Sequence, residues 1–128
     1  MTPVIAKLIE LFTEIVPEAY FLSNSNPTVA YPYLIFSYDA ENRNWGQDGA
    51  YVDVDIFDNK GEDQERIEHL AFLLKRELEH RAVMLEECYV RFRFEGQGTI
   101  DTMSDVLQRR NVRFYITIDW RNEDEKTS

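Results

Sequence analysis

Segment 51–57 alternates strictly between two kinds of side chain. Val52, Val54 and Ile56 fall on one side of an extended chain, and polar or aromatic residues fall on the other. This period of two predicts a β-strand with one face buried and one face in solvent. Because a half-buried strand needs partners and a cover, the chain is expected to fold around a sheet with one protected face.

Three further segments are predicted to join that sheet. Segment 89–94 alternates in the same way, with Arg91 and Arg93 on its polar side. Segment 31–38 is rich in aromatic and β-branched residues, and Pro32 belongs at its start or on an edge because it lacks a backbone donor. Segment 112–120 places five apolar residues on one face: Val112, Phe114, Ile116, Ile118 and Trp120.

Helical spacing of apolar residues predicts the helices that cover one face of the sheet. A first helix begins at Thr2 and Pro3, a hydroxyl cap followed by proline at the first helical position, and ends near Pro17. A long second helix is expected within segment 62–81, with acidic residues early and basic residues late. Segment 104–110 is expected to form a short third helix.

Together these elements predict an α+β fold. The expected order is helix, strand, strand, helix, strand, short helix, strand, with a mainly antiparallel four-stranded sheet packed with helices. Segments 39–49 and 95–101 are expected to be loops. Residues 1–120 are predicted to be a single domain, and residues 121–128 a charged, flexible C-terminal tail.

The bulk composition restricts the classes of function. The net charge is −10, with 14 Lys and Arg against 24 Asp and Glu, which disfavours nucleic-acid binding because that affinity comes mainly from cations on phosphates. No apolar run approaches the roughly 18 residues of a membrane helix, so no membrane partner is expected. Cys88 is the single cysteine and has no partner for an internal disulfide.

No catalytic or metal-binding motif is evident. Asp53, Asp55 and Asp58 form the densest acidic cluster, but the spacing does not match a calcium loop, and a strand explains it better. His69 and His80 lie about three helical turns apart, too far to share a metal. No nucleophile elbow or phosphate-binding glycine motif occurs. No catalytic residue, metal or cofactor is therefore predicted.

Six residues are candidates for a subunit or partner interface. If the strands carrying them are neighbours, Asp53 and Asp55 are expected to pair with Arg91 and Arg93; if not, those charges are available to another subunit. The other two candidates lie in the polar segment 39–49. They are Arg43 and Trp45.

Three stretches carry a resemblance to a known family. They are taken together with the N-terminal helix, the helix after an acidic turn and the long polar segment between the first two strands. The three stretches are Tyr31-Pro32-Tyr33-Leu34-Ile35-Phe36, Val52-Asp53-Val54-Asp55-Ile56-Phe57 and Phe114-Tyr115-Ile116-Thr117-Ile118. Over roughly residues 2–120 the chain resembles the tail completion (tail terminator) proteins of long-tailed bacteriophages and prophages.

The resemblance implies a structural role in virion assembly. Such proteins are not enzymes, need no cofactor, and form a ring, commonly of six subunits, that caps the tail tube and meets a head-side connector. DNA passes through the ring without specific binding. The protein would be made in the host bacterial cytoplasm and reside in the virion. The loop implied to make subunit or tube contacts corresponds to segment 39–49, which makes Arg43 and Trp45 the leading candidates.

Two alternatives remain at this point. The chain could be another head–tail connector (neck) component. A function of a different class is a small metal-dependent enzyme, such as a nuclease, that uses Asp53, Asp55 and Asp58.

Overall fold

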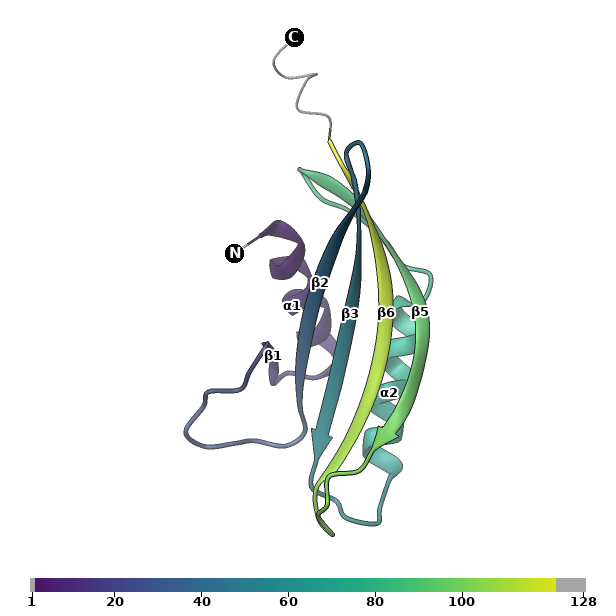
Figure 1. Cartoon of the computed structure of the whole chain (residues 1–128). Helices are drawn as coiled ribbons and strands as arrows, with labels where there is room; N and C mark the ends of the chain where they lie inside the picture. The colour runs from purple at the N-terminus through teal and green to yellow at the C-terminus, as the bar shows by residue number, and fades with distance from the viewer. Residues whose placement is uncertain (1, 122–128) are drawn as a thin grey trace.

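The structure is a computed structural model that describes residues 2–121, without the side chains at positions 43 and 44. One six-stranded mixed sheet in the order β1-β2-β3-β6-β5-β4 forms its framework, and the sheet curls along its length (Figure 1). The strands are β1 (Ala19–Phe21), β2 (Tyr33–Asn44), β3 (Gln47–Asp58), β4 (Ala82–Met84), β5 (Cys88–Ile100) and β6 (Gln108–Trp120).

The predicted four-stranded antiparallel sheet is therefore wrong. Two three-residue strands extend it: β1 pairs in parallel with β2, and β4 pairs antiparallel with β5. Three residues are too few to show an alternating pattern, so sequence periodicity did not indicate them.

Two predicted loops and one predicted helix are also wrong. Most of segment 39–49 and most of segment 95–101 are strand, because backbone pairing with β3 and β6 continues where the side chains are polar on both faces. Residues 101–107 connect β5 to β6 without a helix, and β6 already begins at Gln108.

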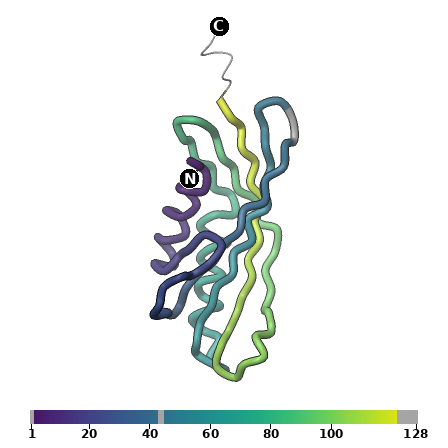
Figure 2. Tube along the Cα trace, turned by 60° about the vertical axis from the view of Figure 1, so that its left-hand side comes forward, coloured from purple at the N-terminus to yellow at the C-terminus, as the bar shows by residue number. Residues whose placement is uncertain are grey.

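Two helices cover one face of the sheet and leave the other uncovered (Figure 2). Helix α1 (Pro3–Ile15) begins as predicted, since Thr2 Oγ1 accepts a hydrogen bond from the Ile5 amide at 3.2 Å. Helix α2 (Glu65–Leu78) has acidic residues in its first turn and basic residues in its last turn. Neither helix of the described residues is long and apolar enough to cross a membrane.

The core lies between the helices and the covered face of the sheet. Val52, Val54 and Ile56 of β3 are fully buried, as the alternation predicts. Phe12 of α1 packs edge-on against Phe36 of β2, with ring centroids 5.0 Å apart. Full burial of each such side chain contributes about 1.5–3 kcal/mol of transfer free energy.

Of the predicted C-terminal tail, residues 121–128, the structure describes only Arg121. Arg121 donates its backbone amide to the Glu87 carbonyl at 2.9 Å, which continues the pairing of β6 with β5 by one contact. The rest of the predicted tail, residues 122–128, lies outside the described residues.

Candidate functional site

The sheet face opposite the helices carries most of the predicted interface residues, and we call it the open face. Asp53 and Asp55 of β3 and Arg91 and Arg93 of β5 all point to this side, because the strand positions between them are buried against the helices. The open face is therefore a surface of alternating charges and aromatic rings.

The predicted pairing of Asp53 and Asp55 with Arg91 and Arg93 does not form. Strand β6 lies between β3 and β5, so these side chains are not neighbours. The structure instead pairs each aspartate with an arginine of β6. Asp53 lies 3.4 Å from Arg113, and Asp55 lies 3.1 Å from Arg109.

Arg91 and Arg93 have acidic partners of their own yet stay accessible. Arg91 lies 3.2 Å from Asp119 and Arg93 lies 2.8 Å from Glu95. The two arginine side chains are 52% and 65% exposed. Exposed pairs of this kind contribute at most about 1 kcal/mol, so both arginines can exchange partners at low cost.

Aromatic rings on the open face contact one another and the neighbouring arginines. Tyr51 and Tyr115 meet edge-to-face with centroids 4.8 Å apart, and the Arg113 guanidinium lies 4.2 Å from the Tyr51 ring centroid. Arg93 covers the Tyr115 ring at 5.0 Å. Tyr115 is only 5% exposed as a result, although no helix lies over it. Cation–π contacts of this type keep the guanidinium groups of Arg93 and Arg113 close to the tyrosine rings.

Asp58 does not join Asp53 and Asp55. It lies on the covered face, fully buried, and the Arg66 guanidinium holds both of its carboxylate oxygens at 2.7 and 2.5 Å. Burial raises the pKa of the Asp58 carboxyl, but hydrogen bonds from Arg66 and the Asn59 amide outweigh burial and hold the pKa below its usual value.

The three aspartates therefore do not converge on one metal ion. Within residues 2–121, no group of three His, Cys, Asp or Glu side chains is arranged to hold a metal. Cys88 is fully buried, and burial raises the pKa of its thiol, which disfavours the reactive thiolate.

The hairpin of β2 and β3 presents Trp45. Its side chain is 95% exposed at the turn, followed by Gly46 with φ +66°, a conformation that favours glycine. The hairpin is fixed to β6 near its end, because Trp120 Nε1 donates to Asp48 at 2.8 Å and Gln47 donates to Asp119 at 2.7 Å. Arg43 belongs to β2, and the structure does not describe its side chain.

A basic cleft of about 700 Å³ lies beside β5, and sequence reasoning did not find it. Its cationic residues come from α2, from the approach to β4 and from β5, so only the fold brings them together. Among the described residues that line it, Glu79 is the one acidic residue. The cations that line the basic cleft are Lys75, Arg81, Arg91 and Arg93, and His80 lies beside them.

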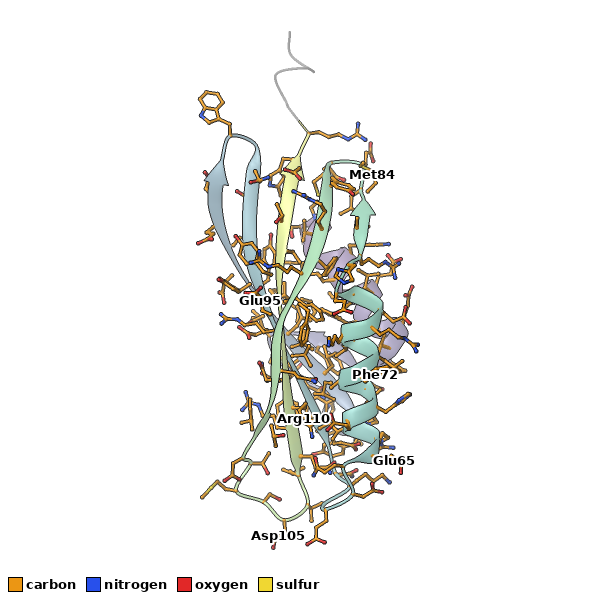
Figure 3. All side chains as sticks on the ribbon, turned by 90° about the vertical axis from the view of Figure 1, so that its right-hand side faces the viewer. Glu65, Phe72, Met84, Glu95, Asp105 and Arg110 are labelled. Carbon is orange, nitrogen blue, oxygen red and sulfur yellow. The ribbon has the colours of Figure 1, made fainter. Side chains whose placement is uncertain are left out.

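The two ends of the molecule differ. In Figure 3, Met84 lies at the end that carries the β4–β5 turn, and Asp105 lies at the opposite end, in the loop between β5 and β6. That loop exposes 91% of Met103 and is held by side-chain caps, since Ser104 Oγ accepts from the amides of Val106 and Leu107 at 3.1 Å.

Comparison with known proteins supports the fold alone. No protein-family model matches the chain, and no curated protein matches it. A solved structure that carries no descriptive name matches with a TM-score of 0.69 and 13% sequence identity, over 91% of this chain and 91% of that chain. The chain is thus similar in fold to a protein of known structure, over nearly its whole length.

Proposed function

We propose that the chain is a structural assembly protein, a tail terminator that forms a ring on a phage tail tube and joins it to the head connector. The observation that carries the proposal is Trp45, which is 95% exposed at the turn of a hairpin of two 12-residue strands. Tryptophan is enriched among the residues that dominate binding energy in protein interfaces.

The way Trp45 is held strengthens the argument. Asp48 and Gln47 anchor the hairpin to β6, so the exposed Trp45 ring is carried by a hairpin that is fixed near its end. A preorganised support lowers the entropy that must be lost on binding. Segment 39–49 is also the part of the chain that the family resemblance assigns to subunit or tube contacts.

The proposed role is non-enzymatic and needs no cofactor. Asp53, Asp55 and Asp58 are each engaged by an arginine, and Asp58 faces away from the other two. A net charge of −10 suits a ring through which DNA moves without specific binding, because acidic groups repel phosphates. In this proposal the protein resides in the virion after synthesis in the bacterial cytoplasm.

The first test is native mass spectrometry over a concentration series, with negative-stain imaging of the same sample. The proposal expects a closed ring with a central opening at high concentration. If the chain stays monomeric, the same sample is mixed with purified tail tubes. If the chain neither forms rings nor caps tubes, the proposal is contradicted. If the chain binds only head-side connectors, it is another neck component.

Tryptophan fluorescence tests the role of Trp45 directly. Trp120→Phe removes the Nε1 hydrogen bond to Asp48. The contact between Gln47 and Asp119 is kept, and circular dichroism first checks the fold of this variant. In this variant acrylamide should quench Trp45 freely in the monomer and at least about twofold less in the assembly, because an interface excludes water. The matched Trp45→Phe variant reports Trp120, which is already half-buried and should change little. Equal quenching of Trp45 in both states removes it from the interface.

A further inference from the structure

Each long side of the sheet has a stretch of strand edge without a neighbour. Strand β1 covers the edge of β2 only as far as Phe36, and β4 covers the edge of β5 only as far as Arg91. Among residues 2–121 no strand pairs with the outer edge of β2 after Phe36 or of β5 after Arg91. Open edges of this kind are templates for pairing with another chain.

The two open edges lie at the same level of the sheet. Asp39 of β2 is in register with Tyr51 of β3, and Tyr51 is in register with Tyr115 of β6. Tyr115 is in turn in register with Arg93 of β5. Asp39 and Arg93 therefore end one row that crosses the four long strands.

The next polar row repeats the arrangement. Glu41 is in register with Gly49, Gly49 with Thr117, and Thr117 with Arg91. Acidic residues therefore end these rows on the β2 side. On the β5 side the first row ends at Arg93, and the second reaches Arg91, which pairs with Ala82 of β4. All four charged side chains lie on the open face.

We infer that β2 of one copy pairs with β5 of the next copy, with Asp39 and Glu41 set against the arginine side of the basic cleft. This inference rests on the proposed function, since it names the subunit contact of the ring. The two strands run in opposite directions within one copy, because three successive antiparallel pairings separate them. Copies placed side by side in the same orientation therefore bring them together as an antiparallel pair.

Charge complementarity identifies a second copy as the occupant. The basic cleft gathers four of the chain's 14 Lys and Arg residues, although the whole chain carries a net charge of −10. On the opposite edge, Asp39 and Glu41 are exposed. The described residues form no ion pair with either of them, although the Tyr115 hydroxyl donates to Glu41 Oε1 at 3.2 Å. Opposite charges across a strand pair stabilise the pair and fix its register.

The contact is head-to-tail, because it joins two different surfaces of the molecule. Such heterologous contacts give a ring when the rotation between copies closes. The Phe92 amide donates to the Arg81 carbonyl at 2.8 Å, so the stretches that are open on both edges at the same level are short, residues 37–39 of β2 and 93–96 of β5. Charge therefore supplies much of the specificity, and the association is expected to be concentration-dependent.

A charge-exchange experiment tests the pairing by native mass spectrometry of the full chain. Variant A carries Asp39→Lys and Glu41→Lys, and variant B carries Arg91→Glu and Arg93→Glu. Alone, each variant presents like charges on both edges, and the concentration needed for half-assembly should rise at least about tenfold. Mixed at equal concentration, A and B should form rings in which the two alternate, because every contact again joins opposite charges.

One control and two contrary outcomes make the result decisive. Far-UV circular dichroism must show that each variant is folded. Variant A removes no described ion pair and one hydrogen bond on the open face, from Tyr115 to Glu41, whereas variant B removes two ion pairs, so variant A can carry the test if variant B unfolds. Variants A and B that each assemble as well as wild type overturn the edge pairing but leave the proposed ring in place. A wild-type chain that caps tail tubes yet never self-associates also overturns the pairing while supporting the proposed function.

Discussion

At the residue scale, the fold depends on apolar side chains that β3 buries completely against the helices, while the charged side chains between them face the open side. The alternation in segment 51–57 placed Val52, Val54 and Ile56 in the core, and all three are fully buried. The charged partners were not predictable in the same way. Asp53 and Arg93 lie in short periodic segments, but their partners depend on which strand lies between them, and periodicity carries no information on strand order.

Ile56→Ala tests the predicted core. Removal of a fully buried side chain at the centre of the sheet should lower the free energy of unfolding by roughly 2–5 kcal/mol, since a cavity is left behind. Urea unfolding measures the change. Ile35→Ala is the matched control, because Ile35 lies only half-buried on the open face and should cost less. Equal losses would mean that the open face is as well packed as the core.

The Asp58–Arg66 pair makes a pH-dependent prediction. Arg66→Met leaves the Asp58 carboxylate buried without its cation, which should cost about 3 kcal/mol at neutral pH, toward the low end for a broken buried pair because the Arg66 side chain is 40% exposed. The pKa of Asp58 is depressed in the folded wild type, so the pair stabilises the fold above the unfolded pKa of about 4. That stabilisation is lost as the pH falls through the folded pKa.

The deficit of Arg66→Met relative to wild type should therefore shrink on acidification below about pH 4. Urea unfolding at several pH values measures it. Arg76→Met, on the same helix with an exposed pair to Glu77 at 3.2 Å, should change stability by less than about 0.5 kcal/mol at every pH. A deficit for Arg66→Met that stays constant with pH would show that the lost contact is packing rather than charge.

At the scale of elements, length decided what the sequence revealed. Helix α1 and the inner halves of the long strands were predicted because their patterns run over several turns or pleats. Strands β1 and β4 have three residues each and were missed. The polar ends of β2 and β5 were taken for loops, since neither face is buried there and backbone pairing alone makes them strands.

The connection between β3 and α2 depends on one glycine. Gly61 has φ +61°, and a Cβ built there would lie 3.2 Å from the Asp105 carbonyl oxygen. Gly61→Ala should therefore lower the free energy of unfolding by about 1–2 kcal/mol, through the left-handed conformation and this close approach. Thermal unfolding measures the change. Gly98→Ala is the matched control and should leave the melting temperature unchanged or slightly raised, because nothing lies within 4 Å of its Cβ.

At the scale of the whole molecule, strand order is what creates the candidate site. The sequence indicates an acidic protein with scattered arginines. No pattern in it shows that Asp39 and Glu41 of β2 lie in the same cross-strand rows as Arg93 and Arg91 of β5. The order β1-β2-β3-β6-β5-β4 puts β3 and β6 in the centre and leaves parts of β2 and β5 open at the two sides. An assembly contact as a class is a proposal that follows from the family resemblance, whereas its proposed location needed the pairing of every strand.

Assembly and folding should be linked by mass action. If the ring binds only folded copies, the urea midpoint of the wild type should rise with protein concentration, because association removes folded monomer from the unfolding equilibrium. Circular dichroism of unfolding at concentrations that span the half-assembly point measures the shift. Variant A, with Asp39→Lys and Glu41→Lys, should unfold at one midpoint at every concentration in that range. A concentration-dependent midpoint in variant A would mean that the copies associate through a different surface. If variant A loses the concentration dependence and its midpoint equals that of the wild-type monomer, the coupling is assigned to the β2 edge.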